Sequence, residues 1–331
     1  MNVRVRRTTV HTQRTFTIAR SSASAFGRVI LELGAGGTVG RGEAASTGYY
    51  GQSPESDAAA LQAVKVSDPW DMEGTLRANG ALPASALAAL DAALHDLAGK
   101  RLGVPVWRLL GYARPVPRTA YTLGIADLDT TLADLERLSG HPILKIKVGG
   151  WRDLETVREV RKRSHAELWV DANEAFSPDE APEAARELKD AGIGMLEQPV
   201  PAAAGPEALK RVTDAVYPLP VIADESSLTA RDVPRLSGCV SGVNVKLAKC
   251  GGIRRALEMI HTARAHGMLV MLGCMVETSL GISAAAQISG LADFVDLDGF
   301  LLLADDPFEG LSFEGGRVVV PERPGLGVEP R

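Results

Sequence analysis

The sequence predicts an α/β fold in which a small α+β domain precedes a TIM-like parallel β-barrel. Two observations support this prediction. From about residue 118, short apolar strands alternate with amphipathic helices, which is the pattern of a parallel sheet, and eight such strands suffice to close a barrel. Before residue 118, three strands come first and helices follow, as in an α+β unit. The chain has 331 residues, 45% of them hydrophobic, so it can bury a core of this size.

The N-terminal domain, placed at residues 1–117, is expected to begin with three antiparallel strands separated by Gly and Ser turns. We place these strands at residues 14–20, 26–34 and 38–44. A Gly- and Ser-rich segment follows at residues 46–56, and it either covers a binding site or is an ordinary exposed connection. Helices are expected near residues 54–64 and at 83–103, where Pro stands near the start, Ala and Leu recur at helical spacing and Gly stands near the end.

The barrel, placed at residues 118–304, alternates strands and helices throughout. Its strands are expected at residues 121–125, 143–149, 167–173, 194–199, 220–226, 243–249, 269–275 and 294–299. Its helices are expected near residues 131–139, 152–163, 178–190, 206–214, 253–266 and 279–289, with a weaker one between the fifth and sixth strands. The Gly- and Pro-rich tail, residues 305–331, is expected to hold one short strand and to pack back on the N-terminal domain.

Composition excludes several classes of function. The net charge is −5 with no long block of one sign, so neither nucleic acid nor an anionic membrane is an expected partner. The N-terminus lacks the apolar centre of a secretory signal, and no apolar run reaches the roughly 18 residues of a membrane span. The three cysteines form no CxxC pair: Cys239, Cys250 and Cys274. We therefore expect free thiols and a cytoplasmic protein.

Charged residues recur at the C-terminal ends of the predicted strands. They are Lys147, Asp171, Glu197, Asp224, Lys246 and Asp298. Each of the first four gaps is about one strand–helix unit long, and the last gap is about two units long. A single acidic residue at a strand end usually caps a helix or faces water. Six in phase predict a site at the C-terminal mouth of the barrel, where barrel enzymes carry out their chemistry.

The three carboxylates, Asp171, Glu197 and Asp224, lie on consecutive predicted strands. Three carboxylates in one mouth repel one another unless a cation holds them. Because the set contains oxygen ligands and no His or Cys, it favours Mg²⁺ over Zn²⁺. Lys145 and Lys147 point to one face of their strand, and Lys246 stands on a strand beyond the acidic ones. The lysines are therefore expected beside the acidic cluster and its metal.

Ordered motifs over essentially the whole chain resemble the enolase superfamily. They are "KIKVG", "VDAN", "LEQP", "ADES", "NVKLAKCGGI" and "DLDG". The lysine pair on the second strand with a lysine on the sixth resembles the muconate-lactonising subgroup. The seventh strand, "LVMLGCM", lacks the His of the mandelate-racemase-like branch, and His266 before it is expected to be structural. The "DLD" and "FTIARSS" segments resemble those of dipeptide epimerases, in particular those that act on L-Ala-D/L-Glu.

The resemblance implies a (β/α)7β barrel with an α+β capping domain and one Mg²⁺ per subunit, held by Asp171, Glu197 and Asp224. It also implies a two-base reaction, in which Lys147 and Lys246 invert the α-carbon of the C-terminal residue of a dipeptide from opposite faces. Lys145 would donate to the substrate carboxylate. A homo-oligomer that recycles cell-wall peptides is the implied biological context.

The remaining substrate contacts are assigned by the same resemblance. Arg20 would pair with a glutamate side chain of the substrate, or it is a surface arginine. Asp296 and Asp298 would bind the free amino group, or they support the metal or cap a helix. Thr122 would be a further contact. Lys249 is expected to be a loop residue or a structural neighbour of the site.

Three alternatives stay open. The enzyme acts on hydrophobic or other dipeptides, it is an o-succinylbenzoate synthase or cycloisomerase of the same subgroup, or it is a non-catalytic barrel that binds acidic metabolites. Asp296 and Asp298 oppose the second alternative because two carboxylates would repel a polyanionic substrate. The lysine pair, Lys147 and Lys246, opposes the third.

Overall fold

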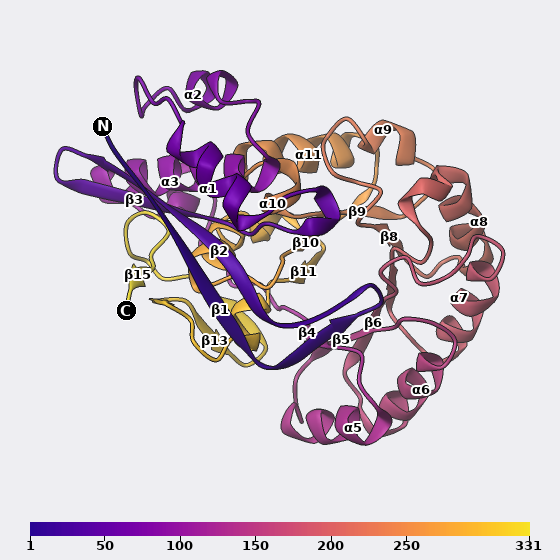
Figure 1. Cartoon of the computed structure of the whole chain (residues 1–331). Coiled ribbons are helices and arrows are strands. Elements are labelled where there is room, and N and C mark those ends of the chain that lie inside the picture. The colour runs from indigo at the N-terminus through magenta and orange to yellow at the C-terminus, as the bar shows by residue number, and fades with distance from the viewer.

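The computed structural model describes all residues, 1–331, and begins with an antiparallel sheet (Figure 1). Its strands are β1 (Asn2–Ile18), β2 (Ser21–Ala35) and β3 (Thr38–Ala44), in the order β1-β2-β3. The first strand was predicted wrongly at 14–20, because it begins at Asn2 and ends at Ile18. Its first half alternates apolar residues with arginines and threonines whose side chains face solvent, and it pairs with β2 along almost its whole length.

Short helices and one long helix complete the N-terminal part. They are η1 (Gly48–Tyr50), α1 (Pro54–Gln62), α2 (Met72–Ala78), α3 (Ala84–Leu102) and α4 (Val106–Leu109). The sequence analysis missed α2 and α4, which are too short to show a helical period. Ser53 and Ser56 form a capping box at the start of α1. Most residues of α3 are buried, because it lies between the sheet and the barrel helices.

Gly40 and Gly42 of β3 let the sheet approach α3 closely. A Cβ on Gly42 would lie 2.0 Å from the Ala89 carbonyl oxygen, and a Cβ on Gly40 would lie 2.2 Å from that of Ala93. These obstacles are backbone atoms, so no side-chain rotation can relieve them.

The Gly42→Ala substitution is therefore expected to lower the free energy of unfolding by about 1–3 kcal/mol or more. Urea unfolding followed by circular dichroism measures this change. Gly37→Ala is the control for a general effect of losing glycine, since a Cβ there meets no atom within 4 Å although its φ of 81° carries its own backbone strain. Unchanged stability of Gly42→Ala would mean that β3 does not lie against α3 as described.

The second part of the chain is an eight-stranded parallel sheet whose strands follow in chain order (Figure 1). They are β4 (Tyr121–Leu123), β5 (Ile143–Lys147), β6 (Glu167–Asp171), β7 (Met195–Glu197), β8 (Val221–Ala223), β9 (Gly242–Val245), β10 (Leu269–Gly273) and β11 (Phe294–Asp296). Ala120 N donates to Val295 O at 3.0 Å, which joins the two outer strands. The predicted α/β barrel with an N-terminal α+β domain is thus confirmed.

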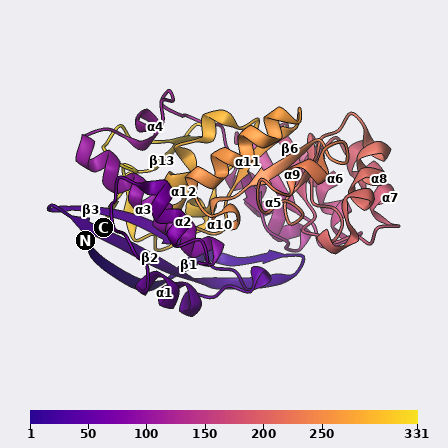
Figure 2. The same ribbon diagram turned by 90° about the horizontal axis from the view of Figure 1, so that it is seen from above.

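Helices surround the barrel. They are α5 (Leu128–Arg137), α6 (Asp153–Arg163), α7 (Ala181–Asp190), η2 (Ala202–Ala204), α8 (Pro206–Val216), α9 (Val233–Leu236), α10 (Leu247–Cys250), α11 (Ile253–Ala265), α12 (Ser279–Ala286), η3 (Ser289–Leu291) and η4 (Gly299–Leu302). The expected weaker helix corresponds to α9, which is a single turn. Seen from above, the sheet of β1–β3 lies along one side of the molecule, and its β1–β2 hairpin extends toward the barrel (Figure 2).

The C-terminal tail holds four short strands in two antiparallel pairs, where the sequence predicted one strand. Its strands are β12 (Phe308–Glu309), β13 (Ser312–Glu314), β14 (Arg317–Val319) and β15 (Glu329–Pro330), paired as β12 with β15 and β13 with β14. Leu326 N donates to Asp96 Oδ1 of α3 at 2.8 Å, and Glu329 pairs with Arg41 of β3 at 2.9 Å. The division of the chain at residue 118 stays a prediction. None of the helices has both the length and the apolar character that crossing a bilayer requires.

The two ends of the barrel interior differ in character. Near the N-terminal ends of the strands, apolar side chains fill the interior: Ala120, Ile143, Trp169, Met195, Ile222 and Met271. At the other end, the last residues of β5, β6 and β7 are Lys147, Asp171 and Glu197, which are partners in register across adjacent strands. These apolar side chains form a plug that closes the N-terminal end of the barrel. The charged groups lie at the C-terminal mouth, so a reaction is expected there.

Candidate active site

A cavity of about 450 Å³ lies at the C-terminal mouth of the barrel, beneath the β1–β2 hairpin and the η1 segment. Eight of the predicted site residues line it: Arg20, Thr122, Lys145, Lys147, Asp224, Lys246, Asp296 and Asp298. Asp171 and Glu197 have no exposed surface and contact the lysines that line the cavity. The structure therefore brings all the predicted site residues together, from both parts of the chain.

Lys145 stands at the centre of the buried charges. Its Nζ lies 3.0 Å from Asp171 Oδ2, 2.7 Å from Glu197 Oε2 and 2.7 Å from Asp296 Oδ2. Burial would lower the pKa of Lys145, but these three carboxylates outweigh burial and hold it well above its usual range. Lys145 is therefore a fixed ammonium group that can donate to a bound anion but cannot readily accept a proton.

Asp171 is contacted by two lysines. Lys147 Nζ lies 2.5 Å from Asp171 Oδ2, and the other oxygen accepts from Asn173 N at 2.9 Å. Burial disfavours the ionised carboxylate, but the charges of Lys145 and Lys147 outweigh burial and hold the pKa of Asp171 below its usual range. Asp171 is thus an anion at neutral pH.

Asp224 is the corresponding anion on the other side of the mouth. Lys246 Nζ lies 2.7 Å from Asp224 Oδ2, and Lys249 Nζ contacts Asp224 Oδ1. Lys249 is buried in α10 and also donates to the carbonyl oxygens of Asp224, Asn244 and Ser227 at 2.7, 2.9 and 3.1 Å. The loop-residue alternative for Lys249 is therefore wrong, and it is a structural neighbour that holds Asp224 in place.

The sheet order separates the two lysines that were predicted to act as bases. The strands that end in or before the carboxylates, β6, β7 and β8, lie between β5 and β9. Lys147 ends β5 and contacts Asp171, whereas Lys246 follows β9 and contacts Asp224. The two amines therefore approach the acidic cluster from opposite flanks, and both line the same cavity.

Lys246 is protonated in this arrangement. Burial would lower its pKa, but the charges of Asp224 and Glu197 outweigh burial and raise it above the usual range. A general base needs a pKa nearer neutrality. A cation bound to Asp224 and Glu197 would offset the rise that they cause in the pKa of Lys246.

Glu197 gives the clearest indication that the site fits a cation. Burial and the nearby Asp171 charge raise the pKa of Glu197 to about 8. Asn244 Nδ2 donates to Glu197 Oε1 at 2.6 Å, while Oε2 is buried without a hydrogen-bond partner. Lys145 Nζ lies within ion-pair distance of Oε2 but outside hydrogen-bond geometry.

The donor set fits a hard divalent cation such as Mg²⁺. Asp171, Glu197 and Asp224 supply only carboxylate oxygens, and one of these oxygens is unpartnered and buried. The three carboxylates do not form a ready group of metal ligands in this structure, and lysine amines contact each of them. Mg²⁺ would therefore share or compete for these oxygens with the amines.

The residues assigned to substrate contact already have partners within the chain. Arg20 lies in the turn between β1 and β2, and its Nη2 is 2.5 Å from Glu225 Oε1. Its guanidinium carbon also lies 4.2 Å from the centre of the Tyr49 ring. With 30% of its side chain exposed and a buried carboxylate as partner, Arg20 is not a surface arginine. It joins the hairpin to the barrel across the mouth.

Asp296 and Asp298 lie beside Thr122 at the seam between β11 and β4. Thr122 N donates to Asp298 Oδ2 at 2.6 Å, and Thr122 Oγ1 lies 3.4 Å from Asp296 Oδ1. Burial and the Asp296 charge raise the pKa of Asp298 to about 7. A cationic group from a ligand would favour the ionised form of Asp298.

The sequence analysis missed several residues of the site. One of them is Glu225, which follows Asp224 directly in the "ADES" motif. Nothing in the sequence indicated that Glu225 pairs with Arg20. Tyr49 and Tyr50 line the cavity together with residues 46–48, so this first part of the segment 46–56 covers the site. The two aromatic rings in a Gly- and Ser-rich segment were the sequence feature that could have indicated this contact with the site.

Comparisons with known proteins agree with this geometry. A family model described as "Mandelate racemase / muconate lactonizing enzyme, N-terminal domain" matches residues 1–111. A second, described as "Enolase C-terminal domain-like", matches residues 130–331. An L-Ala-D/L-amino acid epimerase of Maribacter sp. is 39% identical, over 99% of each chain.

Two solved structures share the whole fold. The dipeptide epimerase of Enterococcus faecalis V583, complexed with Mg and L-Leu-L-Tyr, is 33% identical, with a TM-score of 0.92 and 98% of each chain covered. The substrate-liganded L-Ala-D/L-Glu epimerase of Bacillus subtilis is 32% identical, with a TM-score of 0.93, covering 99% of this chain and 98% of that one. These relatives are epimerases, which places the chain among the isomerases. The chain belongs to the mandelate racemase/muconate lactonizing enzyme family of the enolase superfamily.

Proposed function

We propose that the protein is a Mg²⁺-dependent dipeptide epimerase that inverts the α-carbon of the C-terminal residue by two-base proton transfer. The favoured substrate is L-Ala-D/L-Glu. The observation that carries the proposal is the position of Lys147 and Lys246 on opposite flanks of one cavity. The relatives that are dipeptide epimerases support the substrate class.

The reaction removes a proton next to a carboxylate, and this proton is very weakly acidic. The site must therefore stabilise negative charge that appears only on deprotonation. Mg²⁺, held by Asp171, Glu197 and Asp224, would supply positive charge to the substrate carboxylate. Lys145 adds a permanent ammonium group as a hydrogen-bond donor to the same oxygens. One of Lys147 and Lys246 takes the α-proton, and the other returns a proton to the opposite face.

The substrate's remaining groups find complementary charges in the same cavity. Asp296 and Asp298 provide two carboxylates for the free amino group of a dipeptide, and Thr122 holds both in place. Arg20 would pair with the γ-carboxylate of a C-terminal glutamate. This pairing requires Arg20 to exchange its contact with Glu225 for one with the substrate.

A second candidate is an epimerase of hydrophobic dipeptides. Glu225 already neutralises Arg20, and the cavity wall beside it carries apolar side chains, among them Phe16, Ile18 and Leu302. The Enterococcus faecalis relative is complexed with L-Leu-L-Tyr, which also supports this candidate. An o-succinylbenzoate synthase or cycloisomerase is disfavoured, since Asp296 and Asp298 would repel a polyanionic substrate.

The Arg20→Met substitution distinguishes these two candidates. For an L-Ala-L-Glu epimerase, kcat/KM for this dipeptide is expected to fall about tenfold to a hundredfold, because a charged hydrogen bond is lost. Turnover of L-Ala-L-Leu is expected to stay the same or rise. Steady-state kinetics on both dipeptides measures the change, with Arg7→Met on β1 as control, since Arg7 pairs with Glu55 at the surface. Equal losses on both dipeptides would show that Arg20 closes the cavity and does not read the side chain.

The proposed reaction is tested by incubating L-Ala-L-Glu with the protein and Mg²⁺ in D₂O. We expect deuterium at the glutamate α-carbon and appearance of the L-Ala-D-Glu epimer, both visible by proton NMR. Exchange with other dipeptides but not this one would move the proposal to the second candidate. Absence of exchange with any dipeptide, in folded and Mg²⁺-loaded protein, would refute the proposed class.

The biological context is part of the same proposal. An L-Ala-D/L-Glu epimerase would recycle cell-wall peptides in the cytoplasm. One Mg²⁺ per subunit and a homo-oligomer complete the proposal. Metal analysis of the purified protein and sedimentation velocity test these two points.

A further inference from the structure

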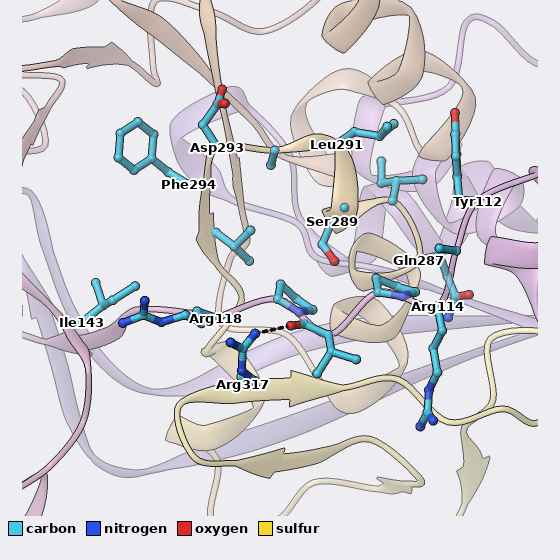
Figure 3. A pocket seen from close by; sticks show the side chains of 18 of the residues that line it. Tyr112, Arg114, Arg118, Ile143, Gln287, Ser289, Leu291, Asp293, Phe294 and Arg317 are labelled. Carbon is cyan, nitrogen blue, oxygen red and sulfur yellow. Dashed lines mark hydrogen bonds between the residues drawn. The ribbon is translucent and has the colours of Figure 1, made fainter.

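A second cavity, of about 570 Å³, lies at the opposite end of the barrel from the active site (Figure 3). Ile143, Glu167 and Phe294, the first residues of β5, β6 and β11, border it. The connection at residues 112–118 and Arg317 of β14 close its other side. This cavity has no role in the proposed reaction.

Two exposed arginines that line this cavity form no ion pair with a carboxylate. Arg118 and Arg317 are paired by an antiparallel bridge, so their side chains leave the backbone as cross-strand neighbours. Like charges in this position repel each other, and Glu314, the register partner of Arg317 on β13, offsets part of this repulsion. Arg118 makes no side-chain hydrogen bond or ion pair, and Arg317 donates only to the Val116 carbonyl oxygen, at 2.9 Å (Figure 3).

Three arginines and two carboxylates line the cavity. Arg114 pairs with Glu322 at 2.7 Å, and Asp293 pairs with Arg264 at 2.7 Å. Glu167 accepts from the Trp169 indole at 2.7 Å, but this donor is neutral. Arg118 and Arg317 outnumber Glu167, the carboxylate of the lining that has no cationic partner, so the lining carries a small excess of positive charge.

The rest of the cavity is apolar. Ten of its 20 lining residues are hydrophobic, among them Ile143, Ile288 and Leu291. A volume of about 570 Å³ exceeds what a bare inorganic ion needs and matches a small organic ligand. A guanidinium pair recognises the oxygen atoms of a phosphate or carboxylate group.

We propose that this cavity binds a small organic anion, with its oxyanion group between Arg118 and Arg317 and its apolar part against the hydrophobic wall. The bound anion would neutralise two like charges that the fold holds together. The site is separate from the catalytic one, because the apolar plug around Trp169 fills the barrel interior between them.

Isothermal titration calorimetry with phenyl phosphate and with benzoate tests this proposal on the full-length protein. We expect saturable 1:1 binding of at least one probe, with Kd raised about tenfold by either Arg118→Gln or Arg317→Gln. Arg6→Gln is the matched control, since Arg6 is an exposed arginine of β1 and removes the same charge. Tighter binding of phenyl phosphate identifies a phosphate ligand, and tighter binding of benzoate identifies a carboxylate.

Three outcomes would overturn the proposal. The first is that neither probe binds saturably. The second is that Arg118→Gln and Arg317→Gln bind the probe as tightly as the unmodified protein does. The third is that Lys246→Ala loses binding, which would assign the probe to the active site. Thermal denaturation of each variant verifies that the exposed substitutions leave the fold intact.

Discussion

Replacing Lys246 with Ala is expected to abolish epimerisation, and Lys147→Ala is expected to do the same from the opposite flank. A positioned general acid or base contributes about 10²- to 10⁴-fold to a rate, and epimerisation uses both amines in every turnover. Neither lysine can replace the other, because β5 and β9 hold them on either side of the three acidic strands. Conversion of L-Ala-L-Glu to its epimer, followed by polarimetry or NMR, measures the loss.

Exchange with solvent separates a catalytic role from a structural one. If Lys147 serves the L-face and Lys246 the D-face, Lys147→Ala still exchanges the α-proton of the D-epimer through Lys246, and Lys246→Ala shows the reverse preference. Lys210→Ala is the control, since Lys210 pairs with Asp214 on the surface of α8, and it should retain normal turnover. A variant of Lys147 or Lys246 with near-normal epimerisation would disprove the two-base assignment.

The barrel was predictable from the sequence because its signal is local and repeated. Each strand–helix unit ends its strand at the same level along the barrel axis. The regular spacing of Lys147, Asp171 and Glu197 therefore predicted that they are neighbours, and in the structure they are register partners. The parallel ladder converts a regular spacing in sequence into a row of side chains in space. The cavity location follows from the same regularity.

Contacts between distant segments could not be predicted in this way. Arg20 and Glu225 are 205 residues apart, and only the folded hairpin brings them together. Lys249 illustrates the same limit on a shorter scale, because its buried contacts depend on the turn of α10 that follows β9. The alternation of apolar and polar residues in the first half of β1 was visible in the sequence. Because many of its side chains are polar and exposed, this half was not predicted as a strand.

The contacts between lysines and carboxylates also explain how the fold tolerates so many buried charges. Lys145 alone contacts Asp171, Glu197 and Asp296, and each added ammonium group offsets part of the cost of burying these anions. Glu197 is the exception, since its pKa stays raised at about 8 despite Lys145. Burial and the Asp171 charge therefore outweigh the positive charge of Lys145 at this position.

Replacing Glu197 with Gln is accordingly expected to abolish turnover and to remove stabilisation by Mg²⁺. Loss of one of three carboxylate ligands weakens binding of the ion, so added MgCl₂ no longer raises the Tm as it does for the unmodified protein. Removing the ion from the unmodified protein with EDTA is expected to eliminate turnover, and MgCl₂ is expected to restore it. Glu183→Gln is the control, since Glu183 is exposed on α7 and removes the same charge.

The metal-free protein provides an independent test of the same residue. Because the folded state raises the pKa of Glu197 from 4.5 to about 8, its contribution to stability is present below pH 4.5 and is lost as the pH rises towards 8. In EDTA, the Glu197→Gln variant should lack this decline and equal or exceed the unmodified protein in Tm at pH 8, as urea or thermal unfolding at several pH values would measure. A metal-free Glu197→Gln variant that was less stable at every pH would show that the ionised carboxylate is a structural partner of Lys145 and Asn244, whose charge the fold needs even without a cation.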